Sequence, residues 1–143
     1  MSVISAAMVG FACSELVTRT DMTRTAIVKV CFLLNDYAKD HGSLPVSLDA
    51  LPKPKPDREI NYLVDGWGRP LVYQIGKDST VTVCGRVGNG LFGGGDDANT
   101  CLRYYSKRTD GTLWAGSDDW LLAAQVPGSE GKVGMQWYIN RTK

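Results

Sequence analysis

The chain has little of what catalytic or nucleic-acid-binding proteins usually show. It has one histidine, and its four cysteines form no CxxC pair, so a zinc site or a thioredoxin-like site is unsupported. Its formal net charge of +1 gives no reason to expect nucleic acid as a partner. The apolar run at residues 3–13 is shorter than the about 20 residues that cross a bilayer. No positive charge precedes Arg19, so this run is not a typical secretory signal either.

We expect no enzymatic activity. His41 follows a predicted helix end, and Cys31 lies on the apolar stripe of that helix, so a Cys–His pair is not indicated. Residues 93–95 are glycines but lack the lysine and the helix start of a phosphate loop. The acidic pairs at residues 96–97 and 118–119 lie in Gly-rich segments, where carboxylates bind a cation or water more often than they form a glycosidase pair.

A helix is predicted for the front of the chain, ending at His41. Apolar residues recur at i, i+3, i+4 and i+7 and form one stripe, with polar residues on the other side. Gly42 is typical of the position after a helix, and Pro45 stops any continuation. A helix that began near Ser2 would be about 60 Å long, so its front end should protrude and need a membrane or other helices to cover it. The stripe consists of Ile27, Val30, Cys31, Leu34, Tyr37 and Ala38; the polar side consists of Arg24, Lys29, Asn35, Asp36, Lys39 and Asp40.

The rest of the chain predicts strands and loops. Residues 43–59 contain four prolines and should form an extended linker, pinned to the body by Leu44, Leu48 and Leu51. The predicted fold is α+β: a long N-terminal helix (residues 1–41) on an antiparallel sheet of three to five strands within a domain of residues 42–143. Strands are expected at residues 71–75, 80–85 and 102–106, with a fourth and fifth at 121–126 and 134–139 and a Gly-rich excursion at 87–100.

The strongest candidate site is the acidic loop, residues 106–120. Asp110 and Gly111 favour a tight turn, and the adjacent Asp118 and Asp119 follow, so three carboxylates could face one point. Calcium prefers such an environment, with about 6–8 oxygen ligands. The alternatives are a solvated acidic loop between strands, or an ion held by Asp96 and Asp97 instead. Whether Cys84 and Cys101 form a disulfide stays open; an oxidising compartment would favour it.

Three segments, in this order, resemble the type II secretion major pseudopilins and related type IV pilin-like proteins. Residues 37–45 resemble the end of the family's helix, with its Tyr, acidic stretch, Gly and Pro. Residues 65–73 resemble the family's Asp-Pro-Trp-Gly-Arg-Pro turn, with Gly66 in place of the first Pro. Residues 106–119 resemble its closing loop.

The resemblance implies a structural subunit of a pseudopilus in a type II secretion-type system. Its partners would be copies of itself, other pseudopilins and the inner-membrane components of that system. The N-terminal helix would sit in the bacterial inner membrane and the globular domain in the periplasm. In the family the closing loop binds structural calcium, which the resemblance implies for Asp110, Asp118 and Asp119, with the carbonyl of Lys107 as a further ligand.

Gly10, Phe11 and Glu15 resemble the start of the mature family chain. The polar residues that follow cannot span a membrane, so we interpret residues 3–13 as the end of a longer membrane helix. An ordinary buried helix is the alternative. If Phe11 is instead the mature N-terminus, Glu15 would set the register between subunits.

The alternative function is a surface-tethered or periplasmic module that binds a glycan or a secreted protein. Gly-rich loops and exposed tryptophans would form its binding surface. Large aromatic side chains in a small sheet domain more often belong to the core. The tryptophans are Trp67, Trp114, Trp120 and Trp137.

Overall fold

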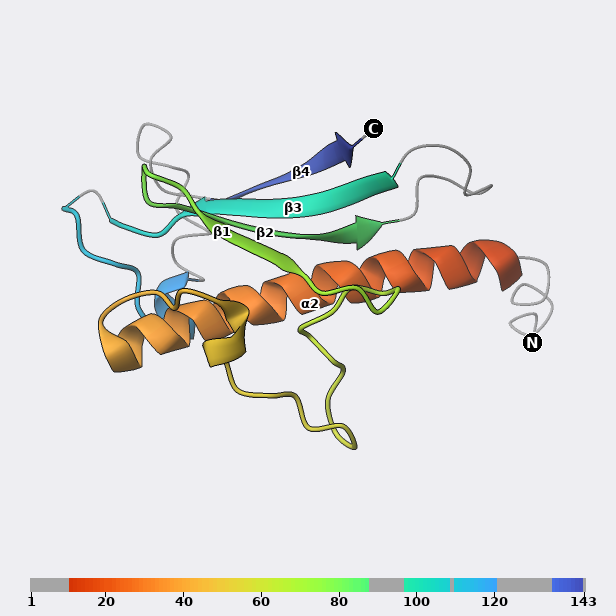
Figure 1. The fold of residues 1–143 in the computed structure, drawn as a ribbon, viewed down its shortest axis with the longest axis horizontal. Coiled ribbons are helices and arrows are strands. Elements are labelled where there is room, and N and C mark those ends of the chain that lie inside the picture. Colours follow the sequence, from red (N-terminus) through yellow and green to blue (C-terminus); the bar gives the residue numbers. More distant parts are fainter. Residues whose placement is uncertain (1–10, 88–96, 109, 121–134, 143) are drawn as a thin grey trace.

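The structure is a computed structural model that describes residues 11–87, 97–108, 110–120 and 135–142. One helix packs on one face of a four-stranded antiparallel sheet, which confirms the α+β class (Figure 1). The strands lie side by side in chain order, each paired with the next. The elements are helix α2 (Phe11–His41), the short 3-10 helix η1 (Leu48–Ala50) and strands β1 (Val72–Ile75), β2 (Thr80–Val87), β3 (Asp97–Tyr105) and β4 (Met135–Thr142).

The middle of the sheet is longer than the sequence predicts. β2 continues to Val87 and β3 already begins at Asp97, so both ends of the expected excursion at residues 87–100 belong to strands. The predicted bounds of the excursion were wrong at both ends. Val87 and Ala98 are paired and both buried, and their burial favours continued strand pairing. The expected strand at residues 134–139 is found as β4, and that at 121–126 lies outside the described residues.

The core lies between α2 and the central strands. The predicted stripe faces β2 and β3, and Tyr37 is its one partly buried member. Asn35 was expected on the polar side, but it is only 1% exposed. Its Oδ1 accepts a hydrogen bond from the hydroxyl of Tyr104 at 3.1 Å, which compensates for burying the amide oxygen. The buried side chains that meet in this core include Ile27, Val30, Leu34, Val81, Val83, Leu102 and Tyr104.

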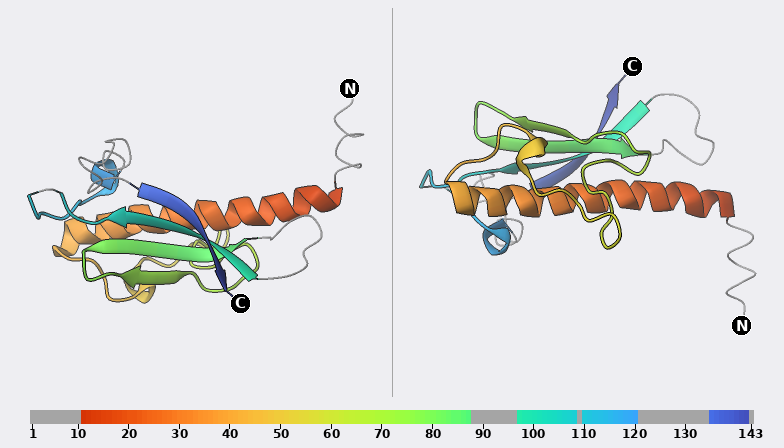
Figure 2. Two further views of the ribbon diagram at one scale, coloured as in Figure 1. Left: turned by 90° about the horizontal axis from the view of Figure 1, so that it is seen from above. Right: turned by 60° about the horizontal axis from the view of Figure 1, so that its bottom comes forward.

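Helix α2 ends where the sequence predicts. Gly42 adopts a left-handed φ of 79°, and its N–H bonds to the carbonyl of Ala38 at 2.8 Å. At the other end, α2 extends past the ends of the strands (Figure 2). The expected start near Ser2 lies outside the described residues. Within the part of the chain described, no helix is both long and apolar enough to cross a bilayer.

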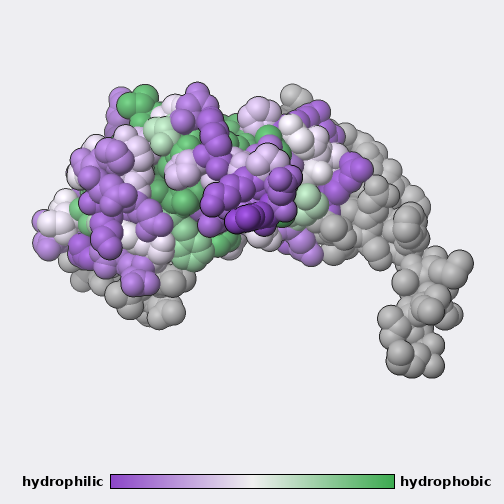
Figure 3. All heavy atoms as spheres, turned by 90° about the horizontal axis from the view of Figure 1, so that it is seen from below, coloured by the Kyte–Doolittle hydropathy of each residue, from purple (hydrophilic) through white to green (hydrophobic). Residues whose placement is uncertain are grey.

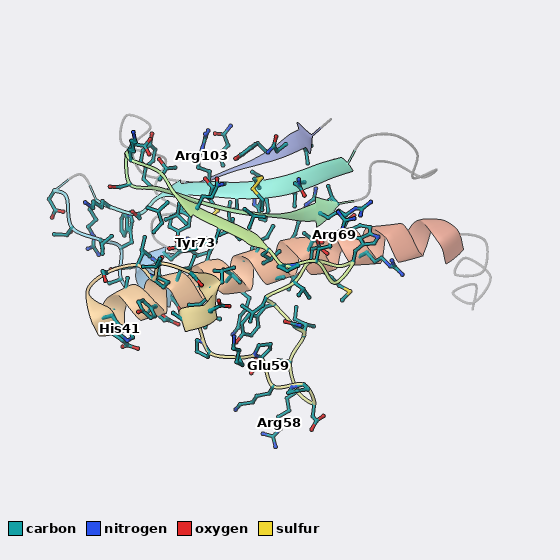
Figure 4. The ribbon with its side chains drawn as sticks, viewed as in Figure 1. His41, Arg58, Glu59, Arg69, Tyr73 and Arg103 are labelled. Carbon is teal, nitrogen blue, oxygen red and sulfur yellow. A yellow bond between two sulfur atoms is a disulfide. The ribbon has the colours of Figure 1, made fainter. Side chains whose placement is uncertain are left out.

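The linker after α2 begins beside β1, where the hydroxyl of Tyr73 donates to the carbonyl of Pro45 at 2.9 Å. It then loops out below α2, on the face of the molecule away from the sheet (Figure 1). Leu51 is buried and Leu44 and Leu48 pack against the core, as predicted for the residues that pin it. Further along, Arg58 and Glu59 are exposed, and Arg58 points away from the body (Figure 4). Hydrophilic side chains cover much of this face, with smaller hydrophobic areas between them (Figure 3).

Candidate functional site

The acidic loop is docked on the C-terminal half of α2. Its backbone reaches the helix directly: the N–H of Gly116 bonds to the carbonyl of Asn35 at 2.7 Å. The N–H and hydroxyl of Ser117 both donate to Oδ1 of Asp36 at 2.8 Å. Trp114 and Trp120 are 8% and 3% exposed, so they anchor the loop in the core instead of offering a binding surface.

The loop does not bring its three aspartates to one point. Asp110 is exposed, and its Oδ1 accepts hydrogen bonds from the N–H and hydroxyl of Thr112 at 2.9 and 2.6 Å. These bonds, the hydroxyl's first, lower the pKa of Asp110 because they favour the ionised carboxylate. Asp118 and Lys107 are exposed, and Asp119 pairs with an arginine of the loop.

Among the described residues, no three or more His, Cys, Asp or Glu side chains form a group that could hold a metal ion. Of the second acidic pair, Asp96 lies outside the described residues, and Asp97 pairs with Thr142 at the start of β3. Calcium binding at either place stays a prediction.

The loop instead closes around Arg108, which the sequence analysis did not single out. Its Nη2 lies 2.5 Å from Oδ2 of Asp119, and its Nη1 lies 3.2 Å from the carbonyl of Leu113. Nη1 is also 3.4 Å from the hydroxyl of Thr112, and Cζ lies 4.6 Å from the ring centre of Trp114. The sequence signal was a pair of basic residues, Lys107 and Arg108, in a loop that also carries three aspartates.

A second docking point, the Trp67 turn (residues 65–70), lies against the N-terminal half of α2. Asp65 is 5% exposed and accepts three backbone hydrogen bonds. Its Oδ1 accepts from the N–H groups of Trp67 and Arg69 at 2.8 and 3.1 Å, which closes the turn. Its Oδ2 accepts from the N–H of Arg86 at 3.1 Å, which fixes the turn to β2.

Thr23 joins this turn to the helix. Its Oγ1 accepts a hydrogen bond from the N–H of Gly66 at 2.9 Å and lies 2.7 Å from the carbonyl of Arg86. A Cβ on Gly66 would lie 2.1 Å from the carbonyl oxygen of Arg19, which is backbone and cannot swing aside. Proline at this position would also remove the N–H that donates to Thr23. The close approach of turn and helix therefore accounts for glycine at position 66.

The remaining predicted residues are spread over the molecule. Glu15 lies in α2 near its start. His41 is exposed and stacks on Tyr37 with ring centres 3.9 Å apart. Cys31 is fully buried, which raises the pKa of its thiol and keeps it from acting as a nucleophile. It lies ten residues before His41 on the same helix, about 15 Å along the axis.

The other two cysteines, Cys84 and Cys101, are directly opposite each other on β2 and β3 and form a disulfide. Comparisons of this chain with protein-family models, with curated proteins and with solved structures find no match.

Proposed function

We propose that this protein is a structural subunit of a pilin-like filament, a pseudopilus of a type II secretion-type system. The observation that carries the proposal is that all three segments resembling the pseudopilins meet one helix. Residues 37–45 end α2, the Trp67 turn docks at Thr23, and the acidic loop docks at Asn35 and Asp36. The three segments are thus parts of one arrangement around α2, as a common subunit shape would require.

The length of α2 supports packing between subunits. Its 31 residues span roughly 46 Å. Among the strands that the structure describes, β3 is the longest, with nine residues that span roughly 30 Å. The N-terminal part of the helix therefore extends beyond its own sheet, and helices of neighbouring copies would pack against it. Residues 3–13, which are apolar in sequence, would continue this surface into the inner membrane.

The disulfide supports a periplasmic globular domain. Disulfides persist in oxidising compartments such as the bacterial periplasm and are rare in the cytosol. The Cys84–Cys101 bond joins the two central strands, so an oxidising compartment suits the domain. The protein would then meet copies of itself, other pseudopilins and the inner-membrane components of the secretion system.

Sedimentation velocity of the full chain tests the proposal. We expect assemblies that grow with protein concentration. Leu16→Asp, which places a charge in the N-terminal part of α2, should abolish them. Val46→Asp is the matched control: Val46 is 97% exposed on the globular body, and the variant should assemble like the wild type. A wild type that stays monomeric at every concentration, or a Leu16→Asp variant that still assembles, would contradict the proposal.

A binding module is the second candidate, favoured by one observation. Trp137 and Ile139, on the same face of β4, are 39% and 46% exposed. Exposed aromatic side chains suit stacking on a sugar ring. Saturable binding of a glycan by the full chain, lost in Trp137→Ala, would favour this function over the filament.

A further inference from the structure

The side chains of the acidic loop can be compared with the ligands that a calcium ion needs. Calcium needs oxygen lone pairs, and one carboxylate oxygen each of Asp110 and Asp119 already accepts two hydrogen bonds. Oδ2 of Asp119 accepts from Arg108 and from the N–H of Ala115 at 3.2 Å, and Oδ1 of Asp110 accepts twice from Thr112. Two of the three predicted carboxylates, Asp110 and Asp119, therefore already have donors.

The buried polar atoms without hydrogen-bond partners also argue against a calcium site in the loop. Three buried side-chain polar atoms of the described residues lack a hydrogen-bond partner, and all three are N–H donors. They are Nδ2 of Asn35 and Nε1 of Trp114 and Trp120, which lie in or against the loop. A cation is repelled by N–H groups, whereas a site prepared for calcium would leave oxygens in need of a partner.

The guanidinium of Arg108 lies among oxygen groups of the acidic loop. It contacts a carboxylate, a backbone carbonyl and a hydroxyl, which are oxygen groups of the kind that calcium prefers. It also stacks on Trp114, a contact that a guanidinium makes well and calcium does not. A divalent ion beside this guanidinium would meet a like charge. The described residues therefore do not fit calcium in this loop.

We propose that Arg108 is the cation of the acidic loop: its guanidinium ties residues 112–114 to Asp119 and closes the loop without a metal. This cation is part of the chain itself, so the loop is held independently of calcium supply. The inference does not depend on filament assembly, because every contact that carries it lies within one chain.

Thermal unfolding of the full chain, in EGTA and in millimolar calcium, tests the proposal. We expect the same Tm for the wild type in both solutions. Arg108→Gln and Asp119→Asn should each lower Tm by about 3–6 °C, and the double variant should fall no more than about 1 °C below the lower single variant. Arg103→Gln is the control with the same charge change, since Arg103 is exposed on the sheet face away from α2 (Figure 4).

Three results would overturn the proposal. The first is a calcium-dependent rise in the wild-type Tm that disappears in Asp118→Ala or Asp119→Asn, because the ion would then bind in the loop. The second is an Arg108→Gln variant as stable as the wild type. The third is a double variant whose loss of Tm is the sum of the two single losses. A rise that persists in both aspartate variants would place the ion elsewhere, and the double-mutant cycle would then decide whether Arg108 closes the loop. If the protein failed to assemble in sedimentation velocity, that result would contradict the proposed filament and leave the proposal for Arg108 unaffected.

Discussion

The Trp67 turn and the acidic loop dock on the same helix through different kinds of interaction. In the turn, a nearly buried carboxylate, Asp65, accepts three backbone hydrogen bonds, and Gly66 fits only because it has no side chain. In the loop, the central contact joins Arg108 and Asp119, whose side chains are 36% and 27% exposed. Buried contacts fix a position by shape and desolvation, whereas half-exposed charges hold it with less energy and are screened by salt. The turn should therefore be the rigid docking point and the loop the adjustable one.

Removal of the buried carboxylate should have the largest effect. Asp65→Ala leaves three backbone N–H groups without their acceptor, and we expect a loss of about 3 kcal/mol in the free energy of unfolding. Urea denaturation measures it. Asp49→Ala, at an exposed aspartate, is the control and should cost far less. Equal losses in the two variants would contradict the role given to Asp65.

A methyl group on Gly66 should lower the free energy of unfolding somewhat less than Asp65→Ala does. Gly66→Ala forces the turn away from the carbonyl of Arg19, and overpacking of this kind costs about 1–3 kcal/mol. Gly68→Ala separates this clash from backbone strain. Gly68 has a φ of 83° but open space around it, so its variant should lose only about 1 kcal/mol. If Gly68→Ala proved the more damaging change, the close approach to the helix would not be the reason for glycine at position 66.

Salt should distinguish the two regions. In low salt, Arg108→Gln should cost about 1 kcal/mol, and the cost should shrink in roughly 1 M NaCl because the pair is partly exposed. The cost of Asp65→Ala should not change, since its hydrogen bonds are shielded from solvent. Urea denaturation at both salt concentrations gives the comparison. A salt-independent cost at Arg108 would mean that packing on Trp114, not charge, holds the loop.

The smallest effect is expected at Asp110. Its lowered pKa means that its contribution to stability is present above 3.8, the ordinary value, and is lost as the pH falls through the lower folded-state pKa. Thr112→Val removes the hydroxyl bond and keeps the backbone bond, so the pKa of Asp110 should rise toward 3.8. NMR titration of the Asp110 carboxyl measures it. An unchanged pKa would contradict the assignment of the shift to the hydroxyl.

Periodicity and turn signals in the sequence predicted much of the fold. The 3.6-residue spacing of the apolar stripe predicted which side of α2 is buried, and Gly42 with Pro45 predicted its end at His41. The β-branched segments around Val81 and Val83 predicted strand β2. These features are local, so one sequence is enough to read them.

Long-range partners could not be read in this way. Nothing near Asn35 in the sequence shows that Tyr104 reaches its amide, and nothing near Gly66 shows that the backbone of Arg19 approaches it. The acidic loop shows the same limit. The count of carboxylates predicted a cation there, and it did not reveal that Arg108, within the same loop, lies beside Asp119 with a positive charge.

In the proposed filament, copies of this protein pack through α2. Electron cryo-microscopy of assemblies formed by the full chain would show which elements meet. We predict α2 helices packed against one another along the filament axis, with the sheets facing outward. Assemblies in which α2 faces solvent and the copies meet through Trp137 on β4 would contradict it.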